Sequence, residues 1–318
     1  MTGDGGNGDR IARRVAALRA AVADRRTSAP SIASYSSAHR ALRPAGHVHG
    51  VLLLAAASAC APDATDEDAW LPAGLAVDYL DAFARTHRQA IESTADATPN
   101  DGRPARPQPT DGILAGDLLF SRAHELLLDV ELTQTTRRAC LETITTAGRR
   151  LCEGAARRRE LLQADSIDVR AYETALERDG GVLSMASARL GGLLGGATDD
   201  RLEHLAAFGR NLGVAIQLVA GATASADHAP ERPSRSTGLL DVCIETSRSV
   251  DAALIARRDA SGGTTRALCR RAEQRLSAAT EHLDAVTASN ERPLLTDLLA
   301  RVRSASPSDS HGALNDPG

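Results

Sequence analysis

The stretch QTTRRACLETITTAGRRLCEGAARRRELLQ, residues 134–163, decides the fold class. Its apolar residues Leu141, Ile144, Leu151 and Ala155 recur at intervals of three, seven and four, which places them on one face of a helix. Across all 318 residues alanine and leucine dominate, whereas there are only three Phe, three Tyr and one Trp. This balance favours helix over sheet. The sequence therefore predicts an all-α protein.

Helical patterns recur on both sides of this stretch. They predict helices over 10–24, 45–61, 69–93, 112–131, 168–178, 180–195, 199–222, 238–258, 262–286 and 293–304. Irregular segments separate them, and the clearest are 94–112 and 223–237. We expect a disordered tip plus an amphipathic helix over 1–30, a single helical domain over 31–304 and a disordered tail over 305–318.

The charge pattern excludes several classes of site. The net charge is −4, and arginines and acidic residues are interspersed, which argues against a nucleic-acid-binding face. The chain contains no lysine, so a P-loop lysine, a Schiff-base lysine and a lysine general base are all excluded.

Cysteine usage and apolar runs predict the compartment. The five cysteines are odd in number and form no C-x-x-C pair, so we expect reduced, buried core residues of a cytoplasmic protein. The N-terminus has no charged segment followed by an apolar one, and the longest apolar run, 51–61, is too short to span a bilayer. A cytoplasmic protein without a membrane span is the expectation.

Three stretches occur in a recognisable order along the chain: AHRALRP at 38–44, ILAGDLLF at 113–120 and AAFGRNLGVAIQL at 206–218. Together they resemble the trans-isoprenyl diphosphate synthase (polyprenyl synthetase) family, over roughly residues 36–260. The resemblance implies an isoprenoid-synthase-like helical bundle. It also implies a reaction in which an allylic diphosphate ionises to a carbocation that isopentenyl diphosphate attacks, with Mg²⁺ held by carboxylates and phosphate oxygens.

The resemblance identifies remnants of a diphosphate-binding site. Arg43 matches the arginine-proline end of a family motif that binds isopentenyl diphosphate, and Arg40 stands at the position of its lysine. Arg106 matches a later phosphate-binding motif, and Gln217 keeps its place on the second aspartate-rich helix. With Arg88, these arginines are candidates to bind a diphosphate directly, since the guanidinium fork suits phosphate oxygens.

The metal-binding positions of the family hold other residues. The first aspartate-rich motif falls on Arg88, Gln89 and Glu92, and the second falls on Ala220, Gly221 and Ala224. The lysine-threonine pair of the family falls on Asp179 and Gly180. Because Mg²⁺ requires oxygen ligands, we expect no cofactor, and Glu92 and Asp117 are the remaining candidate ligands if Mg²⁺ is used after all.

Three functional hypotheses remain open. The first is a catalytically degenerate family member that acts as a non-catalytic or regulatory subunit, as a homodimer or as a heterodimer with an active prenyl synthase. By resemblance, the 112–131 helix would contribute to its dimer interface. The second is an active prenyltransferase with an atypical site of Arg43, Arg106, Glu92 and Asp117. The third is an isoprenoid-binding protein whose apolar pocket survives.

The 69–93 helix offers a test of these hypotheses. Asp78, Asp81, Arg85, Arg88 and Glu92 lie three or four residues apart and so share one face. The simplest interpretation is two ion pairs, Asp81 with Arg85 and Arg88 with Glu92. The enzyme hypothesis instead requires Asp78, Glu92 and Asp117 to converge across a cavity.

Overall fold

The protein is all-α in a computed structural model, and the residues that the model describes contain no strand. These residues are 4–27, 38, 40–42, 47–61, 67–95, 109–163, 169–225, 263–286 and 292–306. The elements are α1 (Asp4–Thr27), α3 (Val48–Cys60), the short 3₁₀ helix η1 (Glu67–Trp70), α4 (Leu71–Ala95), α5 (Pro109–Leu128), α6 (Gln134–Gln163), α7 (Val169–Arg178), α8 (Gly180–Leu194), α9 (Asp199–Ser225), α12 (Gly263–Val286) and α13 (Arg292–Ser304).

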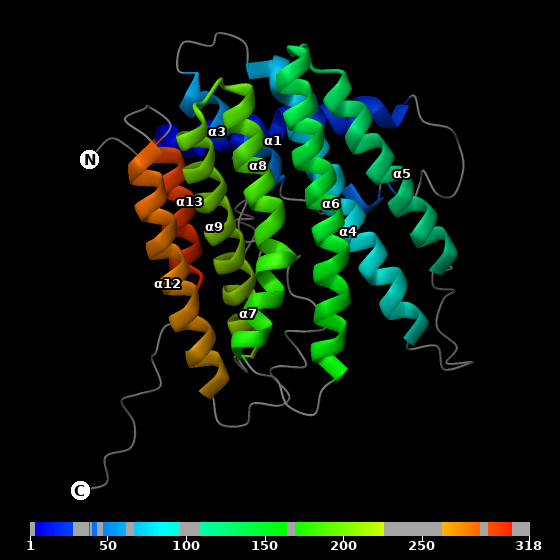
Figure 1. Cartoon of the computed structure of the whole chain (residues 1–318), viewed down its shortest axis with the longest axis vertical. Helices are drawn as coiled ribbons and strands as arrows, with labels where there is room; N and C mark the ends of the chain where they lie inside the picture. Colours follow the sequence, from blue (N-terminus) through cyan, green and yellow to red (C-terminus); the bar gives the residue numbers. More distant parts are fainter. Residues whose placement is uncertain are drawn as a thin grey trace, which may run out of the picture.

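Most helices run along the long axis of a bundle. Figure 1 shows α12 and α13 at one side and α4 and α5 at the other, with α6, α8 and α9 between them on the near face. Helix α1 instead crosses the bundle near one end, where it packs against α3 and α4. One group of buried side chains is centred on α9, α12 and α13, and a second is centred on α4, α5 and α6. Helices α3 and α8 contribute to both groups and join them.

The central helices are apolar on every side. Almost every residue of α3 from Val48 to Ala59 is buried, and so is almost every residue of α8 from Gly181 to Gly192. A helix that is apolar all round is stable only inside a protein. Glycines allow these helices to approach closely: a Cβ built on Gly191 would lie 2.3 Å from the carbonyl oxygen of Leu53.

The predicted helices agree closely with the observed ones. The bounds of α6 are those predicted, and most other helix ends differ by one to three residues. Helix α1 begins at Asp4, earlier than predicted, and the predicted 238–258 helix lies outside the described residues. The prediction of buried cysteines was wrong for Cys152, which is exposed on the solvent side of α6, whereas Cys140 on the same helix is buried.

Helix α9 is long and apolar enough to cross a membrane by length and composition. Most of that apolar surface, however, is buried in the bundle. The core helix of a globular fold passes the same test, and its contacts with α8 and α12 account for its composition.

Candidate functional site

An ion pair links α4 to the start of α8 at one end of the bundle. The Nη2 of Arg88 lies 3.7 Å from Oδ1 of Asp179, the residue that immediately precedes α8. The two side chains are 19% and 4% exposed, so the pair is shielded from water on most sides. The attraction between two charges is stronger there than at an open surface. The pair therefore holds the α4 end against the α7–α8 corner.

Polar atoms of the Arg88–Asp179 pair are buried. The Nε of Arg88 is buried and makes no hydrogen bond within the described part of the chain. Asp179 stands at the N-terminus of α8, where a negative charge is favourable even though its side chain accepts no capping hydrogen bond from the helix. Two opposite charges here offset each other.

One turn earlier, α4 carries a second ion pair. The Nε of Arg85 donates to Oδ2 of Asp81 at 2.9 Å, which confirms the predicted pairing. Burial by itself would raise the pKa of Asp81, but the charge of Arg85, with His49 and the Arg85 hydrogen bond, holds that pKa below its usual value. Arg85 also donates to the carbonyl oxygen of Ala41, which ties α4 to residues 40–42.

His49 lies beside this pair and opposite α8. Its Nδ1 is 3.5 Å from Oγ of Ser184. Burial lowers the pKa of His49, and the carboxylates of Asp81 and Asp78 offset that effect only in part.

Asp78 serves the N-terminus of α3. It accepts hydrogen bonds from the backbone N–H of Gly50 at 3.0 Å and from Nδ1 of His47 at 2.8 Å. His47 has a left-handed backbone with φ of 55° and occupies the N-cap position. A carboxylate that binds free N–H groups satisfies the positive end of a helix. Asp78 therefore has a structural role.

Two of the predicted diphosphate-binding residues, Arg88 and Gln217, lie at the start of α8. Arg88 faces Asp179, and Gln217 on α9 packs so closely against α8 that a Cβ on Gly180 would lie 2.5 Å from its Cγ. Arg40 is exposed. Arg43 and Arg106 lie outside the described residues.

The two candidate metal ligands are not shown to meet. Glu92 belongs to α4, and its side chain lies outside the described part of the structure. Asp117 is exposed on α5, where its Oδ1 is 3.4 Å from Nε2 of His87. The same Nε2 donates to the carbonyl oxygen of Ile113 at 3.0 Å. Asp117 thus belongs to the α4–α5 contact, and Asp78 to the α3 N-terminus.

Three described residues onto which the sequence resemblance places metal-motif positions carry no carboxylate. Ala220 is fully buried, Gly221 faces Leu268 of α12, and Arg88 carries a positive charge. Over the described ranges, no three His, Cys, Asp or Glu side chains form a group that could hold a metal ion. Mg²⁺ requires several oxygen ligands around one point, and these residues do not supply them.

Comparison with known proteins identifies the relatives of this chain. A family model described as polyprenyl synthetase matches residues 107–220. A geranylgeranyl diphosphate synthase of Methanosarcina mazei is 29% identical over 154 residues, 46% of each chain. A (2E,6E)-farnesyl diphosphate synthase of Mycobacterium tuberculosis is 30% identical over 186 residues, which cover 57% of this chain and 47% of the relative. Residues 107–220 of this chain thus match the polyprenyl synthetase family.

Solved structures of prenyl diphosphate synthases share the fold of this chain. Geranylgeranyl pyrophosphate synthetase from Pyrococcus horikoshii superposes with a TM-score of 0.73 at 21% identity, over 94% of this chain and 98% of the other. A decaprenyl diphosphate synthase from Rhodobacter capsulatus superposes with a TM-score of 0.68 at 20% identity, over 95% and 100%. The isoprenoid-synthase-like bundle predicted from the sequence is thereby confirmed. In sequence, the chain spans about half the length of the curated relatives it matches.

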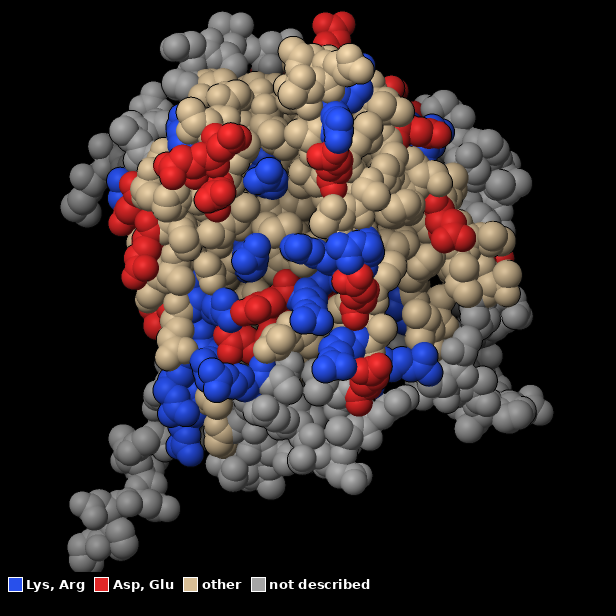
Figure 2. All heavy atoms as spheres, viewed as in Figure 1, with Lys and Arg blue, Asp and Glu red and all other residues tan. Residues whose placement is uncertain are grey.

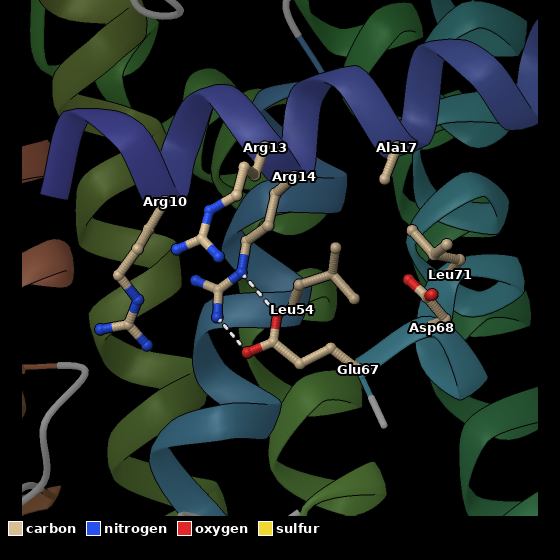
Figure 3. Close-up of a pocket in the computed structure, with 8 residues that line it drawn as sticks. All are labelled: Arg10, Arg13, Arg14, Ala17, Leu54, Glu67, Asp68 and Leu71. Atoms are coloured by element: carbon tan, nitrogen blue, oxygen red, sulfur yellow. Dashed lines mark hydrogen bonds and ion pairs between the residues drawn. The ribbon is translucent and has the colours of Figure 1, made fainter. Parts of the chain in front are cut away.

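A second polar region lies beneath α1, away from the α4–α8 pair. A pocket of about 420 Å³ is lined by Arg10, Arg13, Arg14, Ala17, Leu54, Glu67, Asp68 and Leu71. Figure 3 shows the three arginines leaving α1 on the same side, with the Glu67 carboxylate between them and α3, and with Asp68 at the opposite end beside Leu71.

Arg14 is the centre of this region. It is only 5% exposed, and its Nη2 donates to Oε1 of Glu67 at 2.8 Å and to Oγ of Ser58 at 3.1 Å. Burial would raise the pKa of Glu67, but the hydrogen bond and charge of Arg14, with Ser58, lower it below its usual value. Burial, followed by the charges of Arg14 and Arg13, lowers the pKa of Arg10. This network fastens α1 to α3 and η1.

Sequence reasoning missed both long-range pairs. The Arg88–Asp179 and Arg14–Glu67 contacts join residues far apart in the chain, and helical periodicity relates only residues three or four apart. One signal was available in the sequence. By the resemblance, Asp179 stands where the family has a lysine, and Arg88 stands where the family has an aspartate, so the two replacements are opposite in charge.

Proposed function

We propose that this chain is a catalytically degenerate polyprenyl synthetase homologue that acts as a non-catalytic or regulatory subunit in isoprenoid biosynthesis. One observation carries the proposal: Arg88 stands at a metal-carboxylate position of the family, Asp179 stands at its phosphate-binding lysine, and the two lie 3.7 Å apart. By the resemblance, the charges at these two positions are reversed in sign, and they form an ion pair with each other.

The electrostatic consequence supports loss of turnover. A leaving diphosphate requires cations aimed at its oxygens. In this chain the described cation nearest the first motif is already paired, and an anion stands beside it. Binding a diphosphate there would require breaking a shielded ion pair and then placing negative charge near Asp179.

An active prenyltransferase is the second candidate, because the relatives that match at about 30% identity are named as farnesyl and geranylgeranyl diphosphate synthases. Its site would be Arg43, Arg106, Glu92 and Asp117, of which only Asp117 has a described side chain. An isoprenoid-binding protein without turnover is the third. A cytoplasmic location and a homodimer or heterodimer remain part of the proposal.

The deciding experiment is a prenyltransferase assay. The purified chain is given radiolabelled isopentenyl diphosphate, allylic diphosphates of several lengths and Mg²⁺, with the Methanosarcina mazei synthase as positive control. We expect no product from this chain alone, and a changed rate or product length when it is added to an active polyprenyl synthase from the same cell. Turnover by the chain alone would establish the enzyme. Retention of a labelled isoprenoid, with no product and no effect on the synthase, would establish the binding protein.

A further inference from the structure

A groove of about 500 Å³ lies between α6, α8 and α9. Figure 2 shows basic side chains gathered in a band across the face that these helices present. Three arginines line the groove, one from each helix: Arg150, Arg189 and Arg210. The packing of the three helices thus brings together guanidinium groups that are distant in the sequence.

Among the described residues, no carboxylate forms an ion pair with these three arginines, although Glu142 and Glu203 also line the groove. Arg189 and Arg210 have no Asp or Glu three or four residues away, where a helix could provide one. Within the described ranges, Arg150 and Arg189 form no hydrogen bond or ion pair. Arg210 makes only a contact of its Nη2 with Sδ of Met185 at 3.4 Å.

Neighbouring arginines on α6 behave differently. Arg138 donates to Glu142 at 2.7 Å, Arg157 donates to Glu160 at 3.3 Å, and Arg149 bonds to Glu153. Of the residues in these three pairs, only Glu142 lines the groove. Arg150 follows Arg149 directly and has Glu153 three residues on, yet that carboxylate is used by Arg149. Arg138, Arg149 and Arg157 are thus paired on this helix, whereas Arg150, like Arg137 and Arg159, forms no ion pair in the described part of the structure.

The acidic residues at the groove leave a positive excess. Glu142 is engaged by Arg138. Glu203 also lines the groove but is exposed, and it forms no ion pair in the described part of the structure. Three like charges that share one concave surface repel one another, so a bound anion would be favourable there.

The shape and lining of the groove indicate the class of anion. Arginine forks bind phosphate oxygens in a bidentate manner, and a phosphate or diphosphate carries enough charge to engage more than one of them. Thr143 and Thr146 add hydroxyl groups, while Met185, Ala206 and Ala207 offer apolar surface. The volume lies within the range of small-molecule sites, about 300–1,000 Å³.

We propose that this groove binds a small phosphorylated molecule. Its phosphate or diphosphate is held by Arg150, Arg189 and Arg210, and its apolar part lies on Met185 and Ala206. The site does not depend on the proposed function, because neither Arg88 nor Asp179 lines it. It requires no metal ion.

Calorimetric titration with inorganic diphosphate tests the site, at low salt and with EDTA present so that metal-dependent binding is suppressed. Wild type is compared with Arg150→Gln and Arg189→Gln, and with Arg149→Gln as the matched control. The control removes the same charge from the adjacent residue of the same helix, but from an exposed ion pair. We expect wild type to bind diphosphate. Each groove variant should raise the dissociation constant by about tenfold or more, whereas the control should stay within about twofold of wild type.

Three outcomes would overturn the proposal. The first is the absence of diphosphate binding by wild type. The second is an equal loss in all three variants, which would indicate only the net charge of the surface. The third is unchanged affinity in the groove variants together with loss in Arg88→Gln, which would place the anion at the other site.

Discussion

The pocket beneath α1 and the groove between α6, α8 and α9 are each lined by three arginines and two acidic residues, but only the first holds one of its arginines in a buried ion pair. Beneath α1, Arg14 is buried against Glu67 and Ser58. In the groove, Arg150 and Arg189 are half-buried and have no partner in the described ranges. A cluster of arginines can therefore either stabilise the fold or remain open to a ligand, and the position of the nearest carboxylate distinguishes the two cases.

The difference follows from the energetics of burial. A guanidinium taken out of water must recover its hydrogen bonds, and a partner within the chain makes the cluster part of the fold. Half-buried guanidiniums without such partners rely on water or on a ligand. The Arg88–Asp179 pair belongs with the first kind, since both charges are supplied by the chain.

The largest expected effect tests the balanced cluster. Replacing Arg14 with Met keeps an apolar stem but removes its bonds to Glu67 and Ser58, and we expect the free energy of unfolding to fall by about 2 kcal/mol. Urea unfolding followed by circular dichroism measures it. Arg13→Met is the matched control, because Arg13 is an exposed neighbour on the same helix, and its change should stay within about 0.5 kcal/mol. Equal effects in both variants would show that Arg14 is not the structural member of the cluster.

A smaller effect is expected at the Asp81–Arg85 pair, a third arginine that the chain satisfies itself. The folded pKa of Asp81 is lowered, whereas the unfolded value is about 3.9. Its contribution is therefore complete above roughly pH 4 and is lost as pH falls through the folded pKa. At neutral pH we expect Asp81→Asn to cost roughly 0.5–1 kcal/mol.

Unfolding midpoints of wild type and Asp81→Asn, measured from pH 7 downwards, check this expectation. The difference between the unfolding midpoints of the two proteins should disappear in the acid range. A gap that is independent of pH would mean that the carboxylate charge contributes nothing and that the variant acts through packing.

The smallest effect is expected in the groove. Arg189→Gln removes a charge that no described residue satisfies, so the free energy of unfolding without ligand should change by no more than about 0.5 kcal/mol. The same urea experiment measures it. A loss comparable to that of Arg14→Met would make the groove structural and would remove the contrast between the two clusters.

The helices could be predicted from sequence because their signals are local. In α6 the apolar face recurs with helical spacing, and its predicted bounds equal the observed ones. The glycine- and proline-rich composition of 94–112 predicted a boundary between two helices there. Helix α4 ends at Ala95, and α5 begins at Pro109, slightly earlier than predicted. The order of three short motifs then sufficed to indicate the isoprenoid-synthase-like bundle.

The candidate site was less accessible to the same reasoning. The rule for residues four apart correctly paired Asp81 with Arg85. It also offered Glu92 as the partner of Arg88, whereas the described partner is Asp179, from another helix. Asp78 was considered as a lining residue of a cavity, yet it caps α3 through Gly50. Each of these contacts depends on how two helices meet.

The amino-acid sequence by itself determined that this protein is an all-α bundle, and that part of it resembles the polyprenyl synthetase family. Both are properties of residue type and spacing along one chain. Only the tertiary structure decided which charges neutralise each other: Arg88 with Asp179, Arg14 with Glu67, and none for Arg150 or Arg189 among the described residues. The physical reason is that Coulomb attraction and burial act over a few ångströms in space, whatever the separation along the chain.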